Sequence, residues 1–141
     1  MEQKKTSGKS PIKIEQLDVG YEFPPSSYEL EPLVIAKYLE AVGRPSEQNS
    51  PAPEFVPPMA IAAYTMNAVA ESFALPPGSI HASQELEFLK LVPVGTTIDC
   101  HGRVAQKVNR GQLHLLVIEL EALNQDRERV LSGQATLVVP N

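Results

Sequence analysis

The feature that most limits what this chain can fold into is the segment from Met59 to Leu75, a strongly helical stretch that is apolar on nearly every side. It is rich in alanine and has no internal glycine or proline, whereas prolines border it at 57–58 and 76–77. A helix on a protein surface normally carries one polar face. We therefore predict a helix over 59–75 that the rest of the chain largely buries.

All of the chain after this segment is patterned as β-strand. Residues 80–88, 96–108, 113–123 and 130–139 alternate between apolar and polar side chains, and short turns rich in Gly, Pro and Asn separate them. Alternation with a period of two is typical of strands that bury one face. The pattern predicts a four-stranded antiparallel meander with one face against the helix.

The alternation also assigns each strand residue to a face of the sheet. Four polar side chains of the first of these strands are assigned to the outer face: His81, Ser83, Glu85 and Glu87. Three apolar side chains are also assigned to the outer face, where a lone monomer would expose them to water: Leu113, Leu115 and Val117. Apart from the polar exception Gln84, the side chains predicted to face the helix are Ile80, Ala82, Leu86, Phe88, Ile98, Cys100, Val104, Leu116, Ile118, Leu120, Ala122, Leu131, Ala135, Leu137 and Val139.

The part of the chain before the apolar helix is less regular. Residues 19–23 are interpreted as a short first strand that Pro24 and Pro25 stop. Apolar residues at three- and four-residue spacing predict an amphipathic helix over 30–42, with Pro32 in its first turn and Gly43 at its end. Five prolines in residues 44–58 predict a long loop, and a loop of that length in a compact domain is either disordered or functional.

Length and charge favour one domain that does not bind nucleic acid. The 141 residues fit a single domain, which we place at 13–141 after a disordered tail at 1–12. Four lysines fall in the first thirteen residues, and the remaining chain has eight basic and sixteen acidic residues. A domain with this excess of acidic residues would repel the phosphate backbone of a nucleic acid. The single cysteine, Cys100, allows no internal disulfide, and we expect a cytoplasmic protein without a signal peptide or membrane span.

One buried helix followed by a wrapping antiparallel sheet is the hot-dog arrangement, an α+β fold. Short motifs support it: Ala41-Val42-Gly43 closes the first helix, Phe55 to Met59 leads into the second, and Leu75 to Phe88 and Leu91 to Ile98 follow. In this order and spacing they resemble the MaoC-like dehydratases and R-specific enoyl-thioester hydratases. The resemblance covers most of the chain after the tail and implies a single hot-dog fold wrapped around a long central helix.

The resemblance also identifies a departure in the loop after the first helix. Catalytic members of the family carry an Asp-x4-His pair there. This sequence has Arg44 at the Asp position and Ala52 about where the His would be, although Asn49 and Pro51 partly keep the motif. The paired prolines and the strand at His81 resemble the N-terminal, substrate-holding half of double hot-dog hydratases or the non-catalytic subunit of two-subunit dehydratases. The resemblance therefore implies that independent hydratase activity is in doubt.

The candidate substrate site lies at the start of the second helix. A helix N-terminus offers free N–H groups, and donors aimed at a thioester oxygen stabilise an enolate-like transition state. Pro57 and Pro58 have no N–H, so the first donors would be those of Met59, Ala60 and Ile61; the equally weighted alternative is that these prolines only start the helix. The predicted substrate-binding residues are Val56, Pro57, Pro58, Met59, Ala60, Tyr64 and His81.

The three histidines differ in how well their predicted positions suit a catalytic role. His81 opens the strand after the helix and is the tentative catalytic residue, but a structural histidine paired with Glu85 or Glu87 is the alternative that the pattern favours. His101 and His114 are predicted to face away from the core, as solvated or satisfied residues. The catalytic residues are therefore left unassigned apart from His81.

Three functions remain open. The first is a dehydratase or hydratase of 3-hydroxyacyl and enoyl thioesters of coenzyme A or acyl carrier protein, or its substrate-binding subunit. The second is a non-catalytic acyl-binding module. The third is a hot-dog thioesterase, which would use Glu71, four residues after Asn67 on the helix face that holds Tyr64. No phosphate loop, serine elbow or metal-ligand cluster occurs, so we expect no cofactor or metal.

The predicted oligomeric state follows from the small area of the sheet that one helix can cover. A helix of about seventeen residues leaves the outer face and an edge of such a sheet open, and an open edge invites pairing. Hot-dog domains join two sheets edge to edge, with the acyl tunnel at the seam. We expect a two-fold dimer, homodimeric in isolation or paired with a second hot-dog subunit. Its pocket would be bounded by the loop around residues 56–59 of one chain and the strand near His81.

Overall fold

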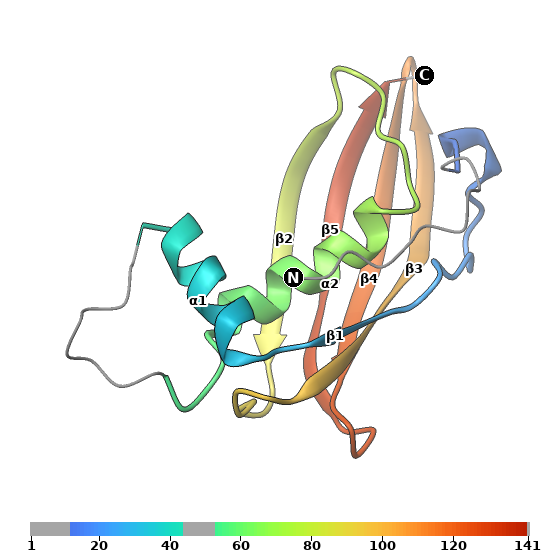
Figure 1. The fold of residues 1–141 in the computed structure, drawn as a ribbon. Coiled ribbons are helices and arrows are strands. Elements are labelled where there is room, and N and C mark those ends of the chain that lie inside the picture. The colour runs from blue at the N-terminus through green and yellow to red at the C-terminus, as the bar shows by residue number, and fades with distance from the viewer. Residues whose placement is uncertain (1–11, 44–52, 141) are drawn as a thin grey trace.

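The structure is a computed structural model that describes residues 12–43 and 53–140. A 3-10 turn, η1 (Ile14–Gln16), precedes β1 (Ser26–Glu29), α1 (Pro32–Ala41), α2 (Pro58–Ala70), β2 (Ile80–Phe88), β3 (Thr97–Arg110), β4 (Leu113–Leu123) and β5 (Arg129–Pro140). The five strands form one sheet in the order β1-β3-β4-β5-β2, and every pairing is antiparallel. The strands curve behind α2, and α1 lies beside the N-terminal half of α2 (Figure 1). The predicted α+β hot-dog architecture is confirmed.

The central helix is shorter and more open than its composition predicts. It ends at Ala70 rather than Leu75, because the Ser72 N–H bonds the Val69 carbonyl at 3.1 Å and Phe73 leaves the helix to pair with Ile12. Its buried residues lie on the side toward the sheet: Ala60, Ile61, Ala62, Thr65, Ala68 and Val69. The opposite side is open, and the Met59 side chain is 56% exposed. A single chain therefore covers only part of this apolar helix.

The predicted first strand at 19–23 is wrong. Gly20 takes a positive φ of 95° within a turn, and Glu22 makes only an isolated bridge with Arg103. The regular strand begins after Pro24 and Pro25, where β1 pairs with β3. The prolines separate the turn from the strand rather than stopping it, because neither has an N–H to give to the sheet.

The first helix agrees with its prediction. It runs from Pro32 to Ala41, and Pro32 occupies the first turn. Gly43 follows with a positive φ of 79°, the conformation that glycine adopts most easily after a helix. Residues 44–52 of the predicted loop lie outside the described residues, as does most of the predicted tail.

The four later strands are confirmed, but β2 differs from its predicted faces. A β-bulge between His81 and Ser83 shifts the register with β5. His81 lies opposite the buried Leu137, and Ile80 lies opposite Val138 on the other face. The assignment of Ile80 to the inner face and His81 to the outer face is therefore wrong, because one extra residue at Ala82 inverts the alternation before it.

The assignment of His114 to the outer face is also wrong. His114 lies opposite the buried Val139, on the helix side of the sheet, two residues before the buried Leu116. His101 lies opposite Glu121 on the outer face, as predicted. Neither the His101 Nε2 nor the His114 Nδ1 has a hydrogen-bond partner among the described residues.

The outer face divides into a charged end and an apolar end. Arg103 and Arg129 pair there with Glu119 and Glu121, the latter across 3.0 Å. The apolar end holds Leu113, Leu115 and Val117, the three residues predicted to be exposed to water in a lone monomer. Of these, Leu113 is 44% exposed and Leu115 is partly exposed, but neighbouring side chains reduce Val117 to 8%.

The contact between α2 and β3 predicts a steric test. A Cβ at Gly102 would lie 2.6 Å from the Val69 Cγ2, so Gly102→Ala should destabilise the fold by about 1–3 kcal/mol through overpacking. Chemical denaturation would measure this loss. If the clash is the cause, Gly102→Ala combined with Val69→Ala should be more stable than the sum of the single effects by about 1 kcal/mol. Strict additivity would contradict the assigned contact.

Cys100 predicts a reactivity test. Its thiol is fully buried, the Thr65 hydroxyl lies 3.5 Å from the sulfur, and burial raises the pKa of the thiol from 9.0 to about 12. Because the thiolate is the reactive form, Ellman's reagent at pH 8 should label the folded protein about a thousandfold more slowly than the urea-unfolded protein. Rapid labelling without denaturant would show that the sulfur is accessible.

Candidate functional site

The segment that leads into α2 is held firmly in place. The Val56 N–H donates to the Val92 carbonyl at 2.7 Å, and the Val94 N–H donates to the Glu54 carbonyl at 3.0 Å. Phe55 bridges to Pro93 between these bonds. The prolines at 57–58 therefore start the helix from a fixed position beside the segment that follows β2.

The helix start offers fewer donors than the sequence suggests. The Ala60 N–H donates to the Pro57 carbonyl at 2.9 Å, so it is already engaged. Pro58 is the first helical residue and has no N–H. Met59 therefore remains the first residue of α2 whose N–H could meet a ligand, and its side chain lies on the exposed side of the helix.

A small apolar hollow of about 220 Å³ lies next to this helix start. It is lined by Val56, Pro58, Ile61, Phe88, Leu89, Lys90, Leu91 and Val92. Phe88, Leu89 and Leu91 are 40%, 42% and 72% exposed, and the Lys90 ammonium is directed to Glu128 at 3.1 Å. The hollow thus presents an open apolar surface whose only cation is already paired, a surface suited to an alkyl chain rather than to an anion.

The structure brings part of the predicted substrate site together. Val56 and Pro58 line the hollow, and Pro57, Met59 and Ala60 adjoin it along the chain. His81 lies at the other end of β2 from Phe88. Seven residues of strand place the two ends ~23 Å apart. In one chain, therefore, the hollow and the imidazole are separate features of the same edge strand.

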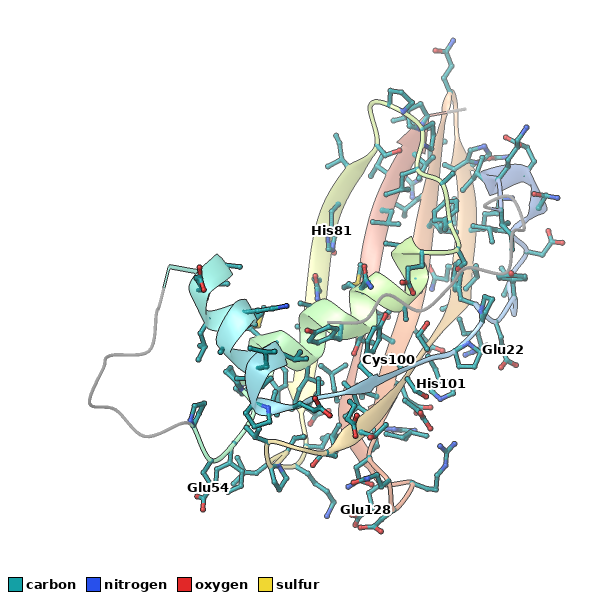
Figure 2. The ribbon with its side chains drawn as sticks, viewed as in Figure 1. Glu22, Glu54, His81, Cys100, His101 and Glu128 are labelled. Atoms are coloured by element: carbon teal, nitrogen blue, oxygen red, sulfur yellow. The ribbon has the colours of Figure 1, made fainter. Side chains whose placement is uncertain are left out.

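His81 faces the helix side of the sheet and is exposed (Figure 2). Glu85 and Glu87 lie on the opposite face, and within the described ranges His81 forms no ion pair or side-chain hydrogen bond. The pairing with a carboxylate that the sequence favoured is therefore not formed. A bulge carries no local sequence signal here, so the alternation alone could not have placed this imidazole.

A polar cluster that the sequence only partly indicated lies on the β1 side of α2. Asn67 Nδ2 donates to the Tyr28 hydroxyl at 3.1 Å, and the hydroxyls of Tyr28 and Ser26 each lie 3.4 Å from the Glu71 Oε1. The Tyr64 ring packs on Tyr28 with centroids 4.8 Å apart. Burial raises the pKa of Tyr28, against a lowering by the bond from Asn67, and burial also raises the pKa of Tyr64.

This cluster leaves Glu71 poorly placed to act at the hollow. Glu71 caps the C-terminal end of α2, whereas Pro58 lines the hollow at the N-terminal end. Thirteen residues of helix separate them by ~20 Å. Tyr28 could not be linked to Glu71 from the sequence, because the two residues meet only when β1 packs beside the helix.

A more spacious groove lies elsewhere, on the outer face of the sheet. It has a volume of about 550 Å³ and lies between residues 22–25 and the charged end of β3, β4 and β5. Its arginines are paired with its own glutamates, as Arg103 is with Glu119. Size alone does not make it the acyl site, because paired charges line much of it and it opens on the face of the sheet opposite α2.

Two kinds of feature are absent from residues 12–43 and 53–140. No helix there is long and apolar enough to cross a membrane. No group of three or more His, Cys, Asp or Glu side chains there is arranged to hold a metal ion.

Comparison with solved structures places the fold among hot-dog domains. A MaoC-like dehydratase from Rhodospirillum rubrum is 22% identical, with a TM-score of 0.71 over 91% of this chain and 96% of that chain. An (R)-hydratase from A. caviae involved in PHA biosynthesis is 18% identical, with a TM-score of 0.70 over 89% and 99%. The C-terminally truncated HadBC (3R-hydroxyacyl-ACP dehydratase) complex from Mycobacterium tuberculosis is 17% identical, with a TM-score of 0.66 over 85% and 96%.

The sequence identifies the family more directly than these distant structures do. No curated protein matches the chain significantly. Residues 17–132 match the family described as FAS1-like, dehydratase domain region, a range that begins just after η1 and takes in both helices, β1 to β4 and the start of β5. The match spans well over half of the chain, and the fold agrees with it. This chain therefore belongs to the FAS1-like dehydratase domain family.

Proposed function

We propose that this chain is the substrate-holding subunit of a dehydratase or hydratase that acts on 3-hydroxyacyl and enoyl thioesters of coenzyme A or acyl carrier protein. The observation that carries the proposal is the family membership combined with Arg44 and Ala52 at the positions where the family resemblance expects Asp and His. Both positions lie outside the described residues, so this argument rests on the sequence.

The chemistry explains why a second subunit is needed. Hydration of an enoyl thioester requires a base that activates water, an acid that delivers the α-proton, and donors at the thioester oxygen. This chain offers the Met59 N–H as a donor and apolar walls at Val56 and Phe88 for the acyl chain. It offers His81 as the one imidazole on the helix side of β2. The acid–base pair would come from the partner subunit.

The surface around α2 favours such a pairing. β2 is bonded to β5 on one side only, so alternate backbone groups along its other side are open. The open side of α2, which includes Met59, lies beside this edge. Phe88 and Leu89, at the end of β2, are also exposed. A second hot-dog subunit that continued the sheet along β2 would cover these apolar residues. It would also bring its own loops to the acyl hollow.

The structural likeness to HadBC, itself a complex, supports pairing with a different subunit. A homodimer in isolation remains part of the proposal, because the same edge is open in every copy. Light scattering distinguishes these states, since the monomer mass is 15.4 kDa.

The non-catalytic acyl-binding module is the second candidate function. The same missing Asp and His favour it, because a chain without them could still hold an acyl thioester. The thioesterase alternative depends on Glu71, and the hydroxyls of Ser26 and Tyr28 on its carboxylate favour a structural role for that residue.

Activity with and without a partner separates the enzyme subunit from the module. The purified chain should hydrate crotonyl-CoA at a rate close to the uncatalysed background, because it lacks the acid–base pair. Adding a co-purifying hot-dog subunit that carries Asp and His should raise turnover by at least about 100-fold, the scale of general acid–base catalysis. Robust turnover by the chain alone would refute the missing-pair argument, and no turnover with the partner would refute the dehydratase subunit.

Ligand binding at the hollow is tested by thermal shift with a panel of acyl-CoAs of increasing length. A ligand at 100 times its dissociation constant adds about 2.7 kcal/mol of stability and should raise the Tm by roughly 5–10 °C. Met59→Asp places a charge on the proposed acyl path and should abolish the shift. Val19→Asp, a change at another exposed apolar residue far along the chain, is the matched control and should keep it. An unchanged shift for Met59→Asp would remove this surface from the binding site.

A further inference from the structure

The open edge of β2 carries two carboxylates on the outer face of the sheet. Glu85 and Glu87 are both exposed and lie opposite polar residues of β5. With Glu119 they line a groove of about 360 Å³ beside the edge. Glu119 is paired with Arg103, whereas Glu85 and Glu87 form no ion pair or side-chain hydrogen bond with any residue that the structure describes.

Pairing of this edge with a second copy of itself would bring the free charges together. Directly opposite side chains in an antiparallel pair lie ~5 Å apart and diagonal ones about 7–8 Å apart. A two-fold axis at Glu85 would set the two Glu85 carboxylates opposite each other. An axis at Leu86 would set each Glu85 opposite Glu87 of the second copy, and an axis at Gln84 would put the two Glu85 residues on a diagonal.

Each of these registers therefore carries like-charge repulsion. The outer-face residues must meet outer-face residues, because side chains of paired strands share a face. Apart from the two carboxylates, the outer-face residue of β2 within the regular part of the strand is Ser83, which has no charge to offset them. The backbone of the edge is thus open to a partner strand, and its side chains disfavour an identical one.

We propose that the β2 edge selects a second hot-dog subunit whose own edge strand carries lysine or arginine on the outer face. This inference rests on the proposed pairing along β2 and specifies the chemistry of the partner. The open N–H and C=O groups give affinity for any extended strand. Glu85 and Glu87 give the discrimination, because they attract a basic strand and repel an acidic one.

The basic partner for the test can be made from the full-length chain itself. The variant Glu85→Lys/Glu87→Lys keeps the same backbone edge and reverses its charge. Analytical ultracentrifugation of the wild-type chain, the variant and their mixture would give the three dissociation constants. At low ionic strength the mixed pair should be at least about tenfold tighter than either self-pair, because several opposed charge pairs each contribute a fraction of that factor. In 1 M NaCl, where the Debye length is ~3 Å, the preference should largely vanish.

A neutral variant keeps the test independent of the charge-reversed protein. Glu85→Gln/Glu87→Gln should tighten self-association about tenfold at low salt, because it removes the repulsion alone. Glu15→Gln/Glu22→Gln removes the same charge from η1 and the segment before β1, and should leave self-association unchanged. Circular dichroism would establish that each variant is folded.

The outcomes separate this inference from the proposed function. A wild-type self-pair as tight as the mixed pair, or a neutral variant no tighter than the wild type, would overturn the charge selection and leave pairing along β2 intact. Monomers in every combination would overturn the pairing and the charge selection together, while the thermal shift with acyl-CoA would still report on substrate binding.

Discussion

The packing of α2 against the middle of the sheet is the interaction on which the rest of this structure depends. It brings the helix so close that β3 has a glycine, Gly102, where a Cβ would strike Val69. The one polar side chain buried in this contact is Thr65, which is satisfied by the Ile61 carbonyl at 2.7 Å. Small and satisfied residues let the sheet curve around the helix at this close distance.

This close contact determines where a substrate can bind. Because the side of α2 toward the sheet is filled, the surface left for an alkyl chain lies on the open side of the helix and beside its N-terminus. The bonds from Val56 to Val92 and from Val94 to Glu54 fix that N-terminus against the end of β2. The candidate site is therefore an edge of the domain rather than its interior, and it is completed only by whatever covers that edge.

The two faces of β2 have different roles in this view. On the helix side, Phe88 lines the apolar hollow at the start of α2, and the exposed His81 lies at the other end of the strand. On the outer side, Glu85 and Glu87 present charge to whatever strand continues the sheet. A short strand thus combines affinity, from its backbone, with selectivity, from its side chains. Figure 1 shows β2 at one of the two edges of the sheet, with β5 as its neighbouring strand.

Much of this could be predicted from the sequence because the relevant patterns are local. The alternation of residues 96–139 predicted three strands and, apart from His114, the faces of their side chains. The prolines indicated where both helices begin, and Gly43 indicated where the first helix ends. The sequence of residues 44–52, compared with the family motif, showed that the Asp and His of the motif are missing. Each of these depends on neighbours within a few positions.

Tertiary packing decided the rest. The bulge after His81 depends on how β2 meets β5, and it moved an imidazole from one face to the other although no residue nearby signals it. The helix stopped at Ala70 because Phe73 found a partner in Ile12, sixty-one positions earlier in the chain. Composition and periodicity report what a segment prefers, whereas register and termination depend on contacts between distant residues, and these exist only in the folded chain.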